Sequence, residues 1–300
     1  MNTAFVFPGQ GAQVVGMARD LVARLPAAKA LFDEAASILG YDLLDVCVNG
    51  PAERLNSTAV SQPAIYVASL AALEQLRIDQ PELVANCPTT AGLSLGEYSA
   101  LTFAGAFSFV DGLRLVHQRG TAMQAAADAS EGTMSAVLIM EQANLEPIVE
   151  AARSAGPVRI ANFLCPGNLV VSGSVAAVEA VEAAVKEAGF TTKRLTVAGA
   201  FHTELMKPAD ETLTRALEGV AFATPRIPVW SNVDAKPHTD PAEIRALLVR
   251  QVVEPVLMES MLRGMLASGV TAMVEIGPGK VIAGLMKRIQ RAVPVTNVPA

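Results

Sequence analysis

One serine lies in a sequence context that is typical of a catalytic nucleophile. Residues 92–96 read Gly-Leu-Ser-Leu-Gly, a G-x-S-x-G motif with Ser94 at its centre. The motif follows an expected strand and precedes an expected helix, and in that context a sharp turn exposes the serine hydroxyl. The N-terminus of the following helix directs amide groups and a positive dipole at an oxyanion formed there. The pattern therefore predicts chemistry through an acyl-serine.

A serine nucleophile needs a base, and the chain has three histidines. His238 lies in a Pro-His-Thr-Asp-Pro segment, which predicts a solvated turn. His117 lies on a half-polar face of a long expected helix, which favours packing at the surface. His202 follows a strand-like stretch and precedes a helix start, where functional groups of α/β proteins collect. We therefore expect His202 to be the base, with a capped structural histidine as the alternative.

Arg119 is the most informative charged residue. Its neighbours three and four residues away on the expected helix are Leu115, Val116, Ala122 and Met123, so the guanidinium projects from an apolar stripe. A guanidinium in that position needs a partner, and its fork matches a carboxylate bidentately. The partner is either a protein Asp or Glu or the carboxylate of a substrate, and the sequence leaves both open.

The elements that must position these residues form two units. Segment 131–197 predicts strands and helices in the order βαββαβ, which is the ferredoxin-like split motif. The flanking segments, 1–130 and 198–300, predict a large α/β domain that this small domain interrupts. Its expected strands are residues 3–7, 89–93, 229–232 and 272–275. A cleft between the two units is the expected place for a ligand.

Composition excludes several classes of function. A net charge of −6 argues against nucleic-acid binding, which needs a basic surface. No apolar run reaches the roughly 18 residues of a membrane-spanning helix. The N-terminus lacks the features of a signal peptide, and three scattered cysteines predict neither a disulfide framework nor a metal site. We therefore expect a cytoplasmic protein with reduced thiols, no membrane or metal partner, and a monomeric state by default.

Six blocks of the sequence together resemble the malonyl-CoA:acyl-carrier-protein transacylases, which are the acyltransferases of fatty-acid and polyketide synthesis. The blocks occur in the order of that family and span almost the whole chain. They are Phe7–Gln13, Gly92–Glu97, Leu115–Gly120, Ala200–Met206, Gln251–Val256 and Glu275–Gly279. Each block is weak by itself, and the set is specific.

The resemblance implies an α/β-hydrolase-like large domain with a ferredoxin-like insertion, in agreement with the pattern of elements. It also implies a ping-pong enzyme that moves a malonyl group from malonyl-CoA to the phosphopantetheine thiol of holo acyl carrier protein, for fatty-acid synthesis. No cofactor of its own is implied, because the carrier protein brings the phosphopantetheine.

The resemblance assigns Ser94 as the nucleophile and His202 as its base. Gln251 would orient the histidine through a carbonyl in place of an acidic third residue, and Gln10 would form the oxyanion hole with the amide of Leu95. A neutral carbonyl is adequate because a thiolate leaves far more readily than an amine, so less imidazolium stabilisation is needed.

Three further residues are implied to bind substrate. Arg119 would hold the malonyl carboxylate. Phe201 would leave little room for the extra methyl of a methylmalonyl group, a discrimination of about 1–3 kcal/mol. Asn162 would lie near the substrate channel, with a turn-satisfying role as the alternative. Leu93 stands where the family usually has histidine, which predicts altered packing.

Two other functions are compatible with the same residues. A simple serine hydrolase would release free malonate. A non-catalytic module that binds carrier protein would have kept the fold without a complete set of catalytic residues, whereas this chain has Ser94, His202 and Arg119.

Overall fold

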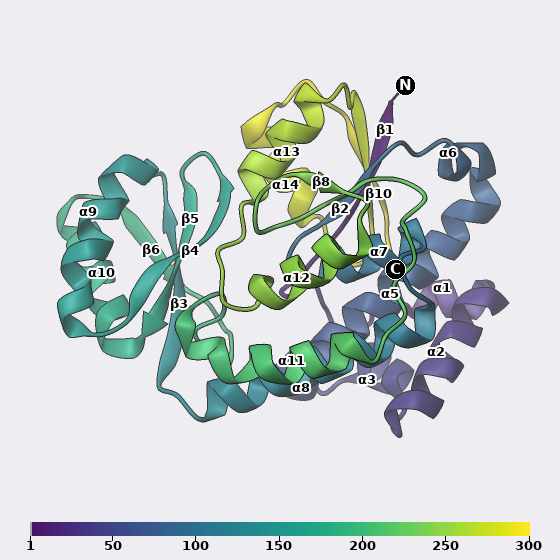
Figure 1. Cartoon of the computed structure of the whole chain (residues 1–300), viewed down its shortest axis with the longest axis horizontal. Helices are drawn as coiled ribbons and strands as arrows, with labels where there is room; N and C mark the ends of the chain where they lie inside the picture. Colours follow the sequence, from purple (N-terminus) through teal and green to yellow (C-terminus); the bar gives the residue numbers. More distant parts are fainter. Residues whose placement is uncertain (1) are drawn as a thin grey trace.

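The computed structural model describes residues 2–300 and contains two separate β-sheets (Figure 1). The larger sheet has the strand order β10-β9-β1-β2-β7-β8. Its strands are β1 (Thr3–Phe7), β2 (Thr90–Gly92), β7 (Val229–Trp230), β8 (Pro237–His238), β9 (Ala272–Ile276) and β10 (Val295–Val298). All neighbouring strands are parallel except β7 and β8.

Strand β1 lies in the middle of this sheet, and all five of its residues are buried. Phe5 and Phe7 face one apolar cluster, which includes helices α5 (Thr58–Asp79), α7 (Gly96–Ala104) and α8 (Phe109–Asp128). Ala4 and Val6 face a second cluster with α13 (Met258–Ala267) and α14 (Val281–Ile289). Because helices cover both faces of the sheet, β1 carries apolar side chains on both of its faces, as strands of parallel sheets commonly do.

The smaller sheet is antiparallel and has the order β4-β5-β3-β6. Its elements are β3 (Gly132–Leu138), α9 (Gln142–Ala152), β4 (Val158–Cys165), β5 (Asn168–Ser174), α10 (Val175–Glu187) and β6 (Thr191–Arg194). Their βαββαβ order confirms the expected ferredoxin-like motif, which projects from the larger unit in Figure 1. All four strands lie within 131–197; the exact domain boundaries stay a prediction.

The remaining helices belong to the larger unit, where most of them pack against other helices. They are α1 (Arg19–Arg24), α2 (Pro26–Leu39), α3 (Leu43–Asn49), α4 (Ala52–Asn56), α6 (Pro81–Ala85), α11 (Lys207–Glu218) and α12 (Pro241–Gln251), with short 3₁₀ turns at Arg153–Ala155 and Glu204–Met206. Helix α8 packs between α5 and α11, and its first turn is capped by Ser108, whose Oγ accepts the Asp111 amide at 3.0 Å. That cap fixes the start of the helix that holds Arg119.

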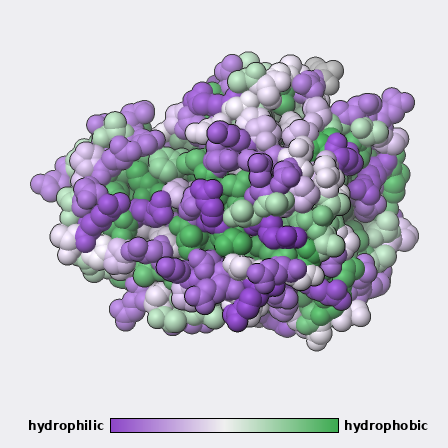
Figure 2. All heavy atoms as spheres, in the orientation of Figure 1, coloured by the Kyte–Doolittle hydropathy of each residue, from purple (hydrophilic) through white to green (hydrophobic). Residues whose placement is uncertain are grey.

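The surface is mixed. In Figure 2 hydrophilic residues cover most of the projecting parts of this face, and apolar residues gather along its middle. Between residues 2 and 300, none of the helices combines the length and apolar character that a bilayer crossing requires.

Three expectations from the sequence need correction. The edge strand β10 was not expected, because its four residues lie between Pro294 and Pro299 and show no periodicity. His238 is not in a solvated turn: it forms strand β8, and its imidazole lies between the carboxylates of Asp234 and Glu243. Asn162, for which a turn-satisfying role was the alternative, lies within strand β4, which continues to Cys165.

Candidate active site

Ser94 lies on the sharp turn between β2 and α7, as the motif predicts. Its φ of 48° is in the left-handed region, which a residue with a side chain rarely adopts. A Cβ added at Gly92 would lie 1.9 Å from the carbonyl carbon of Gly96, and one added at Gly96 would lie 2.2 Å from the carbonyl oxygen of Phe7. Only glycine fits at either position, so the turn presses its backbone against β1 and exposes the serine side chain.

His202 is positioned to accept the proton of this serine. Its Nε2 lies 3.0 Å from Ser94 Oγ, and its Nδ1 lies 2.8 Å from the main-chain carbonyl oxygen of Gln251. Because a carbonyl only accepts, Nδ1 carries the proton and Nε2 presents its lone pair to the serine. The predicted base and its orientation through a carbonyl are both compatible with this geometry. The main chain of Gln251 makes this contact, not its side chain.

Arg119 is 1% exposed and points at the serine. Its Nη2 donates to Ser94 Oγ and to Gln251 Oε1, each at 3.0 Å, and its Nη1 donates to Gln62 Oε1 at 2.7 Å. The guanidinium carbon lies 5.5 Å from the centre of the Tyr98 ring. None of these hydrogen-bond partners is a carboxylate, so Arg119 makes no direct ion pair with a protein Asp or Glu. A buried cation beside the nucleophile is available to bind an anionic group of a substrate.

Comparison with known proteins agrees with this geometry. Residues 4–298 match the family model of the acyl transferase domain. The chain is 43% identical over 292 residues to the malonyl CoA-acyl carrier protein transacylase of Bacillus subtilis, covering 96% of this chain and 90% of that protein. This chain belongs to the malonyl-CoA:acyl-carrier-protein transacylase family. The resemblance drawn from the six blocks is therefore confirmed, and the chain is an acyltransferase.

Solved structures of transacylases have the same fold. An acyl-carrier-protein S-malonyltransferase from Bartonella henselae superposes with a TM-score of 0.96 at 37% identity, covering 99% of this chain and 95% of that one. A malonyl-transacylase in complex with a type II PKS acyl-carrier protein superposes with a TM-score of 0.95 at 37% identity, covering 99% and 96%. These neighbours confirm the expected α/β fold class.

The transacylase cavity next to Ser94 has a volume of about 290 Å³. Its polar lining includes His202, Arg119 and Asn162. The apolar lining residues come from both units and are Leu93, Met123, Met134, Leu164, Val170, Leu195, Val197, Phe201 and Val281. A larger groove of about 740 Å³, lined by Thr203 among others, contains none of the predicted site residues. We assign the substrate to the smaller cavity, because that is where the nucleophile lies.

All three predicted substrate-binding residues, Arg119, Phe201 and Asn162, line this cavity. Phe201 is 5% exposed and forms part of the wall. Asn162 is held where β4 meets the large unit, because the amide of its neighbour Phe163 donates to the carbonyl of Val256 at 2.9 Å. The Oδ1 atom of Asn162 is buried without a hydrogen-bond partner among residues 2–300. That arrangement favours the substrate channel over a turn-satisfying role.

Of the predicted oxyanion-hole residues, Leu95 follows the serine in the chain and Gln10 lines the same cavity. Neither the main-chain amide of Leu95 nor that of Gln10 donates a hydrogen bond within the described part of the chain. The side-chain amide of Gln10 instead donates to Thr58 Oγ1 at 3.3 Å. Gln10 has two possible donors, its main-chain amide and its side-chain amide. The main-chain amide is therefore the one free to donate to an oxyanion.

Three buried polar residues at this site were not singled out from the sequence. Asn232 Oδ1 accepts the Ser94 amide at 3.0 Å, and Glu97 Oε2 accepts from the main-chain amide of Asn232 at 3.0 Å. Gln62 lies on the apolar helix α5 and holds Arg119. Asn232 follows strand β7, the neighbour of β2, and the carboxyl ends of parallel strands meet at one edge of a sheet. The place of Asn232 after the carboxyl end of β7, beside β2, is the signal by which the sequence could have identified it.

Burial and charge together keep His202 neutral. Burial lowers the pKa of this imidazole from its ordinary value to about 4, and the positive charge of Arg119 acts in the same direction. Burial also lowers the pKa of Arg119, although a guanidinium remains charged at physiological pH. The histidine of the free enzyme is therefore ready to accept a proton over the whole physiological range.

This shift predicts the pH dependence of acylation. The neutral imidazole is the active form, so activity is lost as the pH falls through the pKa of His202 in the folded protein. A free imidazole titrates at about pH 6.5. We expect kcat/KM for acyl-serine formation to stay level through that region and to fall only towards about pH 4. Quenched-flow mass spectrometry of the acyl-protein measures this profile. An acid limb near pH 6.5 would contradict a desolvated imidazole.

Proposed function

We propose that this enzyme transfers the malonyl group of malonyl-CoA to the phosphopantetheine thiol of holo acyl carrier protein, supplying the extender unit of fatty-acid synthesis. One observation carries the proposal: the buried Arg119 guanidinium donates to the same oxygen, Ser94 Oγ, that lies 3.0 Å from His202 Nε2. A carboxyl group bound by that guanidinium places an attached thioester next to the serine. The names of the relatives from Bacillus subtilis and other organisms agree with this substrate.

Acylation starts with attack of Ser94 Oγ on the thioester carbonyl while His202 Nε2 takes the hydroxyl proton. The amides of Leu95 and Gln10 stabilise the oxyanion of the tetrahedral intermediate. Collapse breaks the carbon–sulfur bond, and His202 returns its proton to the departing thiolate of CoA. The products are malonyl-Ser94 and free CoA.

The second half reverses these steps with a different thiol. The phosphopantetheine thiol of the carrier protein gives its proton to His202 and attacks the ester carbonyl of malonyl-Ser94. Collapse breaks the carbon–oxygen bond, Ser94 recovers the proton, and malonyl-carrier protein leaves. The mostly apolar wall of the cavity supports transfer over hydrolysis, because it limits the access of water to the ester.

Selectivity and setting form part of the same proposal. The Phe201 ring in the wall of the cavity supports malonyl over methylmalonyl transfer. The three cysteines, Cys47, Cys87 and Cys165, are free and buried, which supports a reducing, cytoplasmic setting. We propose a monomer that needs no cofactor, metal, membrane or nucleic acid.

Intact-protein mass spectrometry after brief mixing with malonyl-CoA tests the function. We expect a malonyl adduct on the wild type that holo carrier protein discharges, and no adduct on the matched Ser94→Ala variant, which lacks only the attacking oxygen. Accumulation of free malonate without thiol acceptor would favour a serine hydrolase. Absence of both adduct and turnover would favour another acyl donor or a non-catalytic carrier-binding module.

A further inference from the structure

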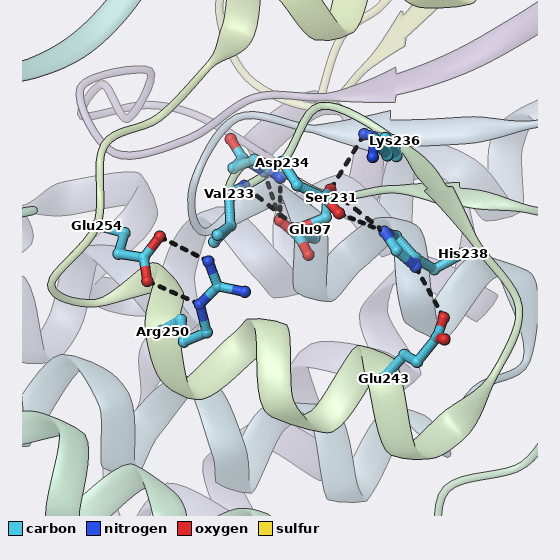
Figure 3. A network of polar contacts seen from close by, with 10 residues as sticks. Glu97, Ser231, Val233, Asp234, Lys236, His238, Glu243, Arg250 and Glu254 are labelled. Atoms are coloured by element: carbon cyan, nitrogen blue, oxygen red, sulfur yellow. Dashed lines mark hydrogen bonds and ion pairs between the residues drawn. The ribbon is translucent and has the colours of Figure 1, made fainter.

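Glu97 is a buried carboxylate at the first turn of α7, three residues after the nucleophile. Its Oε2 atom accepts hydrogen bonds from the main-chain amide of Asn232 at 3.0 Å, from the Asn232 side-chain amide, and from Gln251 Nε2 at 2.7 Å. Figure 3 shows this carboxylate against the turn of Ser231 and Val233, apart from the exposed ion pairs around it.

The partners of Glu97 are the residues that contact the catalytic groups. Asn232 presents its Oδ1 atom to the Ser94 amide at 3.0 Å, so it holds the backbone of the strained turn. Gln251 presents its Oε1 atom to Arg119 Nη2 at 3.0 Å, and its Nε2 also donates to the Ser94 carbonyl at 3.2 Å. Each amide has its donor end on Glu97 and its acceptor end on a catalytic group, so the carboxylate determines which way both amides point.

The charge of Glu97 also matters to Arg119. All three groups on Oε2 are N–H donors, and such donors favour the ionised form of a carboxyl group. Burial raises the pKa of Glu97, and the hydrogen bonds from Asn232 and Gln251 and the positive charge of Arg119 oppose that rise. In the resting enzyme the negative charge of Glu97 reaches the buried cation across the Gln251 amide.

We infer that Glu97 is a positioning residue with two roles: it orients Ser94 through Asn232, and it serves as the counter-charge that keeps Arg119 in place until a substrate carboxylate arrives. The second role deepens the proposed function and rests on it for the identity of the substrate. A residue that only stabilised the fold would not be coupled to the binding of an anion next to Arg119.

The variant Glu97→Gln tests both roles, because glutamine has nearly the same shape and no charge. Charge-assisted hydrogen bonds become neutral ones, so we expect acylation by malonyl-CoA to slow by about tenfold. Malonate should raise the melting temperature of the variant by more than that of the wild type, because the ligand supplies the missing negative charge. Acetate, which has one carboxylate where malonate has two, serves as the reference ligand.

Glu275→Gln is the matched control. Glu275 is equally buried and also has three donors, the amides of Ile282 and Ala283 and the side chain of Asn297, but it contacts no catalytic group. We expect it to lower the melting temperature while the acylation rate and the malonate-induced shift stay at wild-type values. If both variants behave alike, Glu97 is a structural residue and the inference is wrong.

Each role has its own contradicting result. An acylation rate of Glu97→Gln equal to the wild type overturns the positioning role. A malonate-induced shift no larger than that of the wild type overturns the counter-charge role. If Glu97→Gln does not fold, Glu97→Asp replaces it: this variant keeps the charge, so we expect a slower rate with a wild-type malonate shift, and an unchanged rate overturns the inference.

A failure of the proposed function is distinguishable from these results. A wild-type protein that forms no malonyl-Ser94 refutes the function, while the malonate-induced shift still tests the link between Glu97 and Arg119.

Discussion

The Arg119→Ala variant is expected to lose the preference for a dicarboxylic acyl group. Removing one partner of a buried, hydrogen-bonded charge pair costs about 2–5 kcal/mol, so we expect kcat/KM for malonyl-CoA to fall by a factor between roughly 30 and roughly 5,000. Acetyl-CoA has no carboxylate to bind, so its much slower reaction should change little. The ratio of the two initial acylation rates, measured by mass spectrometry of the acyl-protein, checks this result.

Arg119→Lys is the matched control for that experiment. Lysine keeps the positive charge but lacks the planar fork that now reaches Gln62, Ser94 and Gln251 simultaneously. An intermediate malonyl preference is expected. A malonyl-to-acetyl ratio that stays at the wild-type value in Arg119→Ala would show that another group binds the carboxylate.

The second large effect is expected for His202→Ala. General-base catalysis contributes about 10²–10⁴-fold, so acyl-serine formation should slow by that factor while malonyl-CoA binding is retained. The loss therefore appears in kcat with KM little changed. Burst-phase release of CoA from malonyl-CoA under saturating conditions gives this measurement.

His238→Ala is the matched control among the histidines. His238 is paired with Asp234 and Glu243 and does not line the catalytic cavity. Its loss should affect stability alone. Wild-type burst kinetics in His202→Ala would assign the base to a different group.

The sequence was sufficient wherever a local pattern decides the structure. The elbow at Ser94 could be predicted because its two glycines are required by steric contacts within a few residues of the serine and with β1. Arg119 could be predicted as a buried cation because an apolar stripe on one helix surrounds it. The ferredoxin-like unit followed from the order and period of its elements.

The rest of the site depends on contacts between distant parts of the chain. Asn232 and Gln62 have ordinary polar side chains, and only the packing of β7 against β2 and of α5 against α8 brings them to Ser94 and Arg119. The strand β8 has two residues, which is too short for a periodic signal. The choice between an ion pair and a substrate socket for Arg119 also needed the three-dimensional partners.

The strand order has a consequence for biosynthesis. The central strand β1 precedes every other strand of the larger sheet in the chain, but its neighbour β9, which pairs Ala272 with Thr3, comes after β2, β7 and β8. On a ribosome the backbone N–H and C=O groups on one edge of β1 therefore emerge long before β9 can pair with them. Pairings so distant in sequence form slowly, and the waiting strand edge is prone to aggregate. A chain truncated before β9 should therefore be a substrate for chaperones and proteases, even though Ser94, His202 and Arg119 have all been synthesised.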